Sequence, residues 1–139
     1  MNPLYIRGVD EGDVMYNSDT GHWNITRALR DCLAGKHQLY ALDVAEAASY
    51  CMKVTVDADK VAAMIANPQA LYDAPPAIAV IDGGKLYVID GHHRLRAGLQ
   101  LGQKVFGAWV IEEKDADQYR ITFNGEKLCP PDLLKVLTS

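Results

Sequence analysis

Two apolar runs near the middle of the chain predict a β-hairpin that leads into a helix. The runs at 77–81 and 86–89 are separated by a Gly-Gly pair at 83–84, which favours a tight turn between paired strands. Leucines at helical spacing over 95–101 then predict a short amphipathic helix. A further apolar run at 105–111 predicts a strand beside the hairpin.

Earlier in the chain the apolar stretches are shorter and polar residues mark the boundaries between elements. Residues 4–6 and 14–16 predict short strands, and the polar stretch at 17–22 predicts a loop. Asn24 is a good N-cap for a helix that ends at Gly35. The N-terminal part is therefore expected to mix short strands with one helix.

Acidic residues predict the starts of two more helices. Asp43 and Glu46 have the spacing of a capping box, and Asp57 has the position of an N-cap in front of a helix that Pro68 ends. An alternative role for Glu46 is as a metal ligand or base facing a ligand. The predicted order is a strand, a helix, a strand and a helix, at 39–42, 43–50, 52–56 and 58–66.

The remaining segments predict a turn at 71–76, a second hairpin and a closing helix. The second hairpin joins 119–123 to 126–128 through Asn-Gly at 124–125, and the closing helix at 133–137 follows a Pro-Pro pair. We expect one small mixed α/β domain over residues 1–139, with a mixed sheet flanked by short helices.

Composition limits the class of protein. The chain has 139 residues, 49% of them hydrophobic and 23% charged, which is typical of a globular domain. No apolar run approaches a membrane span, and the N-terminus lacks a signal-peptide core. The three cysteines are far apart, which favours free thiols in the cytoplasm. A net charge of −4 argues against binding nucleic acid by bulk electrostatics.

The polar sequence Asp90-Gly91-His92-His93-Arg94, here called the DGHHR box, lies where the predicted strand turns into the helix. A helix N-terminus has unpaired N–H groups and the positive end of the helix dipole, so it favours an anion. Gly91 allows a close approach of the backbone, and Arg94 supplies a forked donor for phosphate oxygens. The box therefore predicts a phosphate site.

The other residues of the box have more than one reading. Asp90 can hold a divalent ion that bridges phosphates, orient a histidine, or cap the turn. His92 can act as a general base or bind a phosphate oxygen, and with His93 it can bind a transition metal. Arg94 can instead pair with a surface carboxylate.

The box resembles the signature motif of the ParB/sulfiredoxin superfamily. The resemblance spans residues 54–113 and includes Asp57-Ala58-Asp59-Lys60-Val61, the segment 74–80 and Gly83-Gly84-Lys85. It implies a small α/β core that binds a nucleotide, with residues 1–53 forming an N-terminal extension packed on this core.

The resemblance also implies roles for single residues. His93 matches the histidine of the sulfiredoxin box that lies next to the phosphates, and Lys60 matches a lysine near the phosphates. His92 stands where sulfiredoxins have their catalytic cysteine, so peroxiredoxin repair is excluded. The Ser and Thr that follow the lysine in that family correspond here to Ala63 and Asn67.

Three classes of function remain. The first is an enzyme that hydrolyses a nucleoside triphosphate (ATP or CTP) with Mg²⁺, or transfers its phosphoryl group, with Asp90, His92 and His93 as catalytic groups. The second is a ParB-like DNA-binding protein or nuclease of plasmid, phage or chromosome maintenance. For this class Arg27 and Arg30 are either a solvated face or a nucleic-acid contact. The third is a catalytically silent regulatory or inhibitory module that keeps the nucleotide-binding fold and binds a nucleotide without turnover. DNA and a protein partner are further candidate ligands.

Overall fold

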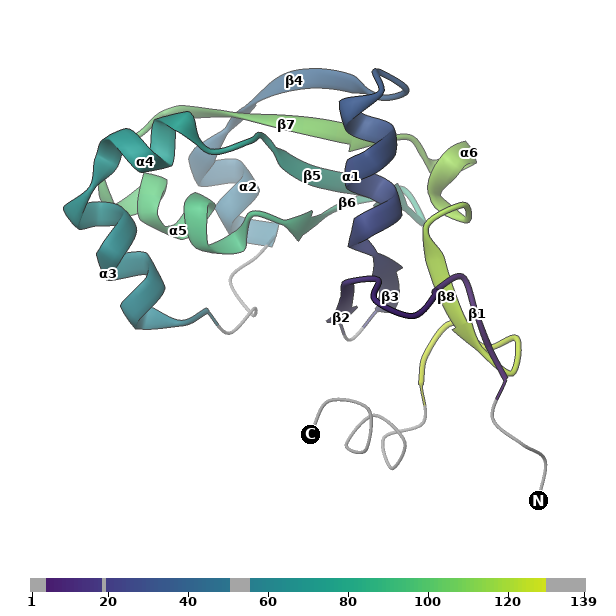
Figure 1. The fold of residues 1–139 in the computed structure, drawn as a ribbon. Coiled ribbons are helices and arrows are strands. Elements are labelled where there is room, and N and C mark those ends of the chain that lie inside the picture. The colour runs from purple at the N-terminus through teal and green to yellow at the C-terminus, as the bar shows by residue number, and fades with distance from the viewer. Residues whose placement is uncertain (1–4, 19, 51–55, 130–139) are drawn as a thin grey trace.

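The computed structural model describes residues 5–18, 20–50 and 56–129. Within these ranges six helices and two four-stranded β-sheets form a small mixed α/β domain, which confirms the predicted class (Figure 1). The strands are β1 (Ile6–Arg7), β2 (Met15–Ser18), β3 (Gly21–Asn24), β4 (Gln38–Asp43), β5 (Ala77–Asp82), β6 (Lys85–Asp90), β7 (Val105–Ile111) and β8 (Arg120–Phe123). The helices are α1 (Ile25–Leu33), α2 (Val44–Tyr50), α3 (Ala58–Ala66), α4 (Pro68–Asp73), α5 (His92–Gln100) and α6 (Glu113–Ala116).

The larger sheet is mixed, with strand order β4-β7-β5-β6. The predicted hairpin is present as the antiparallel pair β5–β6, and β7 lies beside it, parallel to β5. β4 pairs antiparallel with the other edge of β7, so a strand from the first 53 residues belongs to the same sheet as the hairpin. Helix α5 connects β6 to β7, and Figure 1 shows it packed between this sheet and α3.

The smaller sheet joins the two ends of the described chain, in the order β1-β8-β3-β2. The prediction of a loop at 17–22 is wrong, because β2 and β3 form a hairpin there. The polar residues His22 and Asn24 are buried in β3 and fully engaged. Asn24 donates to the carbonyl of Gly8 and to Asp13, at 2.9 and 2.8 Å. The prediction failed because a strand whose polar side chains are buried and hydrogen-bonded has the same polar sequence pattern as an exposed loop.

The predicted second hairpin is also wrong. β8 pairs with β1 on one side and β3 on the other, whereas Glu126 forms only an isolated bridge to Phe123. The Asn-Gly turn itself is present, with positive φ at both residues (53° and 83°). The local turn signal was therefore correct, but long-range pairing determined the strand partners.

The helix starts follow the predicted caps. Asn24 accepts from the Arg27 N–H, Asp43 accepts from the Glu46 N–H at 2.8 Å, and Asp57 accepts from two N–H groups of α3. The turn predicted at 71–76 is wrong in its first half, because Pro68 begins a further helix, α4. Proline suits the first turn of a helix, since its missing N–H would have no partner there.

The core lies on both faces of the mixed sheet. In β5, Ile78 and Val80 face one cluster with Trp23 and Tyr119, whereas Ala79 faces a second cluster with α2 and α5. This alternation is the period of two expected for a strand buried on both faces. The turn from β6 into α5 is thereby held between the two sheets and the helical layer.

Some predictions fall outside the described residues, namely most of the strand at 52–56 and the closing helix at 133–137. Cys32 and Cys129 are buried free thiols. None of the described helices has the length and apolar character needed to cross a bilayer.

Candidate functional site

The DGHHR box has the local structure that the sequence predicts. β6 ends at Asp90, Gly91 adopts a left-handed conformation with φ of 104°, and α5 begins at His92. Among the described residues no side-chain cap is found at the start of α5, so the alternative role of Asp90 as a cap is not observed. The first N–H groups of α5 thus keep the anion-binding character of an uncapped helix N-terminus.

Gly91 is required by the packing of the chain itself. A Cβ at this position would lie 2.7 Å from the Cβ of Ala77 and 3.1 Å from Nη2 of Arg94. The positive φ also disfavours any other residue. The Arg94 side chain therefore folds back over the turn, and the space that glycine leaves is filled by protein.

Arg94 is a largely buried cation without a close counter-ion. Its side chain is 15% exposed, and Nη2 lies 3.8 Å from Oδ2 of Asp90, which is too far for a hydrogen bond. Nη1 is buried and has no hydrogen-bond partner. Burial lowers the pKa of the Arg94 guanidinium, and the nearby Asp90 carboxylate opposes this shift.

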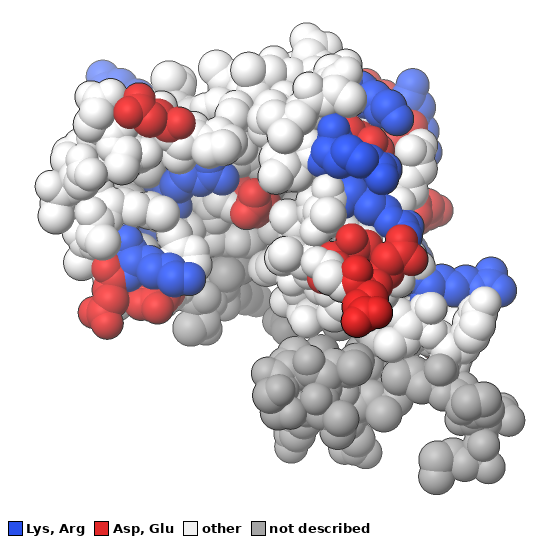
Figure 2. All heavy atoms as spheres, viewed as in Figure 1, with Lys and Arg blue, Asp and Glu red and all other residues white. Residues whose placement is uncertain are grey.

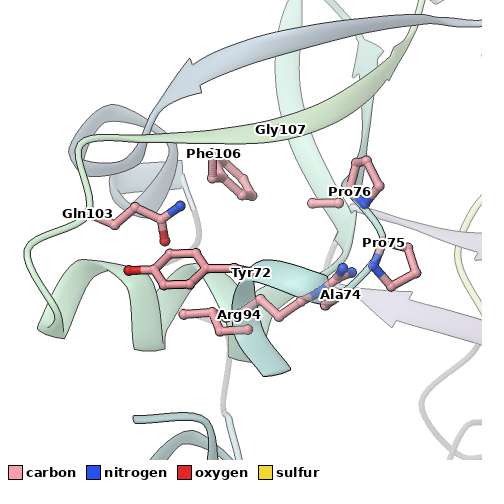
Figure 3. A pocket seen from close by; sticks show the side chains of 10 residues that line it. Tyr72, Ala74, Pro75, Pro76, Arg94, Gln103, Phe106 and Gly107 are labelled. Carbon is pink, nitrogen blue, oxygen red and sulfur yellow. The ribbon is translucent and has the colours of Figure 1, made fainter. Parts of the chain in front are cut away.

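The Arg94 side chain lines a pocket of about 220 Å³ between α4 and β7. Figure 3 shows Arg94 running beside Tyr72 toward Ala74 and Pro75, with Phe106 on the opposite wall. Polar and apolar atoms contribute about equally to its walls, and apart from Arg94 no residue of the box lines the pocket. The box therefore contributes one side chain to this pocket.

His92 turns away from that pocket into the interior. It is 8% exposed and stacks on Tyr16 of β2, with 4.9 Å between ring centroids. The backbone of Val88 bonds to the ring, whereas Nε2 is buried without a partner. Burial lowers the pKa of His92, against opposing effects of Val88 and Asp90, which favours the neutral ring.

His93 faces the start of α3. Its Nε2 accepts a hydrogen bond from the backbone N–H of Asp57 at 3.1 Å. The carboxylate of Asp57 in turn accepts from the N–H groups of Asp59 and Lys60, at 2.9 and 3.3 Å. His93 is thus linked through Asp57 to the backbone of Lys60, and the Lys60 residue is exposed.

Asp90 is the accessible carboxylate of the box, with a side chain that is 40% exposed. Among the described residues, no three His, Cys, Asp or Glu side chains come together as a metal-binding group. His22 and His37 lie elsewhere, bonded to Asn17 and Tyr119. A Mg²⁺ ion at Asp90 would take its other ligands from phosphate oxygens and water, as Mg²⁺ commonly does.

The structure therefore brings the predicted site residues together in part. Asp90 and Arg94 are neighbours, and His93 bonds to the start of α3, the helix that carries Lys60, but His92 is directed into the core. Sequence reasoning missed Tyr16 and Tyr72 as site neighbours. Neither had a local signal, because both come from segments that only the fold brings to α5.

The two arginines of α1 are paired with carboxylates. Nη2 of Arg27 lies 2.8 Å from Asp10, and Nε of Arg30 lies 3.1 Å from Asp31. Figure 2 shows Lys and Arg side chains over α1 with Asp and Glu side chains directly beside them. Of the two readings of Arg27 and Arg30, this pairing favours a surface of mixed charge.

Comparisons with protein-family models, with curated proteins and with solved structures gave no match. The resemblance of the box to the ParB/sulfiredoxin superfamily therefore stays a prediction.

Proposed function

We propose that this protein binds a nucleoside triphosphate (ATP or CTP) with Mg²⁺ through a ParB/sulfiredoxin-like site, and hydrolyses it or transfers its terminal phosphoryl group. The phosphates lie at the start of α5, between Arg94 and the segment that carries His93 and Lys60. One observation carries the proposal, namely the buried Arg94 guanidinium with a free Nη1 donor beside an uncapped helix N-terminus.

The electrostatics of Arg94 support an anionic ligand. A buried charge without a hydrogen-bonded partner is costly, and its pKa falls accordingly. A phosphate that displaces the groups covering Nη1 would bind it and remove this cost, and its other oxygens would accept from the N–H groups at the start of α5. Asp90, which is too distant to satisfy Arg94, is then free to hold Mg²⁺ against the phosphates.

His92 is the residue best suited to accept a proton. With the Val88 backbone bonded to one side of the ring, Nε2 carries the free lone pair of a neutral imidazole. Its burial against Tyr16 limits access, so turnover requires that the attacking group reach Nε2. The same burial favours the second candidate, a regulatory module that binds a nucleotide without turning it over.

A thermal-shift experiment tests binding first. ATP, CTP, GTP and ADP are each added with and without Mg²⁺ to the wild type, to Arg94→Ala and to the matched control Arg96→Ala. At 100 times Kd, a ligand stabilises the folded state by about 2.7 kcal/mol, so Tm rises. We expect one nucleotide to raise the Tm of the wild type and of Arg96→Ala but not of Arg94→Ala. No shift at millimolar concentration with any nucleotide would refute the proposal.

Phosphate release then separates the two candidates. An enzyme releases phosphate from the nucleotide that gave the shift, and His92→Gln abolishes release while leaving the shift intact. Binding without release by the wild type identifies the silent module. If no nucleotide binds, duplex DNA and protein partners are the next ligands to assay.

A further inference from the structure

A second groove, here called the β1–β8 groove, lies at the smaller sheet and shares no lining residue with the Arg94 pocket. Its volume is about 400 Å³, within the range of small-molecule sites. Its charged lining consists of four cations and one carboxylate: Arg7, Arg27, Arg120, Lys127 and Asp117.

The sheet register explains why these cations share one face. Arg7 and Thr122 are directly opposite in the antiparallel pair β1–β8, so their side chains emerge on the same side. Arg120 precedes Thr122 by two residues and points to that side as well. Ile121 and Phe123 alternate with them and are buried in a cluster on the other face.

Two of the cations are already fixed by carboxylates. Arg120 is 4% exposed and bonds to Asp82 at 2.6 Å and to Asp117 at 3.0 Å, while one of its nitrogens, Nη1, has no partner. Arg27 bonds to Asp10 at 2.8 Å. Nε of Arg27 also lies 3.8 Å from Asp13, so each of these guanidinium groups faces two carboxylates, of which Asp117 lines the groove.

The other two cations carry uncompensated charge. Arg7 is exposed and lies over the ring of Tyr5, with 4.9 Å from its guanidinium carbon to the ring centroid. Lys127 is exposed in the segment after the Asn-Gly turn. Within the described part of the chain, neither makes an ion pair with an acidic side chain. The groove is thus lined by two cations without an ion pair and by two arginines that carboxylates hold.

We propose that the β1–β8 groove binds the phosphate group of a phosphorylated small molecule. A phosphate dianion matches the two uncompensated charges of Arg7 and Lys127. Its several oxygens also accept from donors on more than one side, which a carboxylate with two oxygens does less well. The hydroxyl of Thr122, which lies directly opposite Arg7 in the β1–β8 pair, supplies a neutral donor or acceptor for the rest of the ligand.

An NMR titration of the full chain tests this site by position. Pyrophosphate is added at constant ionic strength, and the amide signals of Thr122 and Gly125 report on the groove while that of Gly91 reports on α5. The variants are Arg7→Ala and Lys127→Ala. Lys114→Ala is the matched control, because Lys114 is a 76% exposed lysine outside the groove.

We expect saturable shifts at Thr122 and Gly125, weakened at least about tenfold in each groove variant and unchanged in the control. The titration is repeated with inorganic phosphate and with a sugar phosphate. If the two bind with equal affinity, the site is assigned to the free phosphate ion. If the sugar phosphate binds more tightly than inorganic phosphate, the site is assigned to a phosphate ester. Shifts that do not saturate, or that are as large around Lys114, would overturn the proposal. So would unchanged affinity in both groove variants.

Arg94→Ala keeps this test separate from the nucleotide proposal. Binding at the groove is expected to survive that substitution, since Arg94 does not line it. Loss of the Thr122 and Gly125 shifts in Arg94→Ala would show that the groove is not an independent site. A failure of nucleotides to bind near Gly91 would leave the groove proposal intact.

Discussion

Gly91→Ala tests whether the turn before α5 is shaped by internal packing. The new methyl group would lie 2.7 Å from the Cβ of Ala77 and 3.2 Å from its Cα, so the turn or β5 must move. Gly102 is a matched control, because it also has positive φ, 76°, but a Cβ there meets nothing within 4 Å. Both substitutions therefore place alanine in a left-handed conformation, which costs free energy, but only Gly91→Ala also brings the new methyl group into collision with Ala77.

The expected magnitudes follow from these two contributions. A left-handed conformation costs a non-glycine residue about 1–2 kcal/mol, which is the expected loss of unfolding free energy for Gly102→Ala. The collision with Ala77 adds about 1–3 kcal/mol, as overpacking usually does. Gly91→Ala should therefore destabilise the protein by about 2–5 kcal/mol.

Urea unfolding gives both values, read from the midpoint at constant m. A double-mutant cycle with Ala77→Gly isolates the collision, because removing the opposing methyl group should restore about 1–3 kcal/mol in the Gly91→Ala background. It also gives a readout if Gly91→Ala alone does not fold. Equal losses for Gly91→Ala and Gly102→Ala, or no coupling to Ala77, would refute the packing explanation.

Two further predictions concern buried polar groups. The Tyr119 hydroxyl donates to Asp31 at 2.7 Å, so Tyr119→Phe should lower the free energy of unfolding by about 1–3 kcal/mol. Tyr72→Phe, at an exposed position, should have little effect. Equal urea midpoints for the two variants would contradict this prediction. Burial lowers the pKa of His22, whose Nε2 accepts from the Cys129 N–H. As the pH falls, His22 in the unfolded chain therefore binds a proton before His22 in the folded protein does. The contribution of neutral His22 to the free energy of unfolding is complete above pH 6.5 and declines below it. The decline is at most about 1.4 kcal/mol per pH unit. Urea midpoints between pH 7.5 and 5.5 should fall less steeply in His22→Gln, and parallel slopes would exclude His22 as the cause.

Local signals in the sequence were sufficient for several elements. The hairpin β5–β6, the strand β7 and the caps at Asn24 and Asp57 all depend on residues close together in the chain. Hydrophobic periodicity, capping and turn chemistry act over a few residues, so a sequence reveals them directly. The position of the DGHHR box at a strand-to-helix turn was predictable for the same reason.

The direction of each side chain in the box depended on tertiary structure. Consecutive residues on a helix are rotated by about 100°, so His92, His93 and Arg94 necessarily point to three different neighbours. The sequence shows them as one cluster, but only the fold decides that these neighbours are Tyr16, Asp57 and the pocket beside Tyr72.

The sequence by itself thus determined the class of fold and the turn at which a phosphate site is proposed. Tertiary structure alone decided that β8 pairs with β1 and β3, that polar β3 is buried, and that four cations line one groove. The physical reason is that strand partners and buried polar contacts join residues about a hundred positions apart, as in the bond between His22 and Cys129. No local sequence pattern shows which distant segment will form the hydrogen bonds that a given strand edge or buried polar side chain requires.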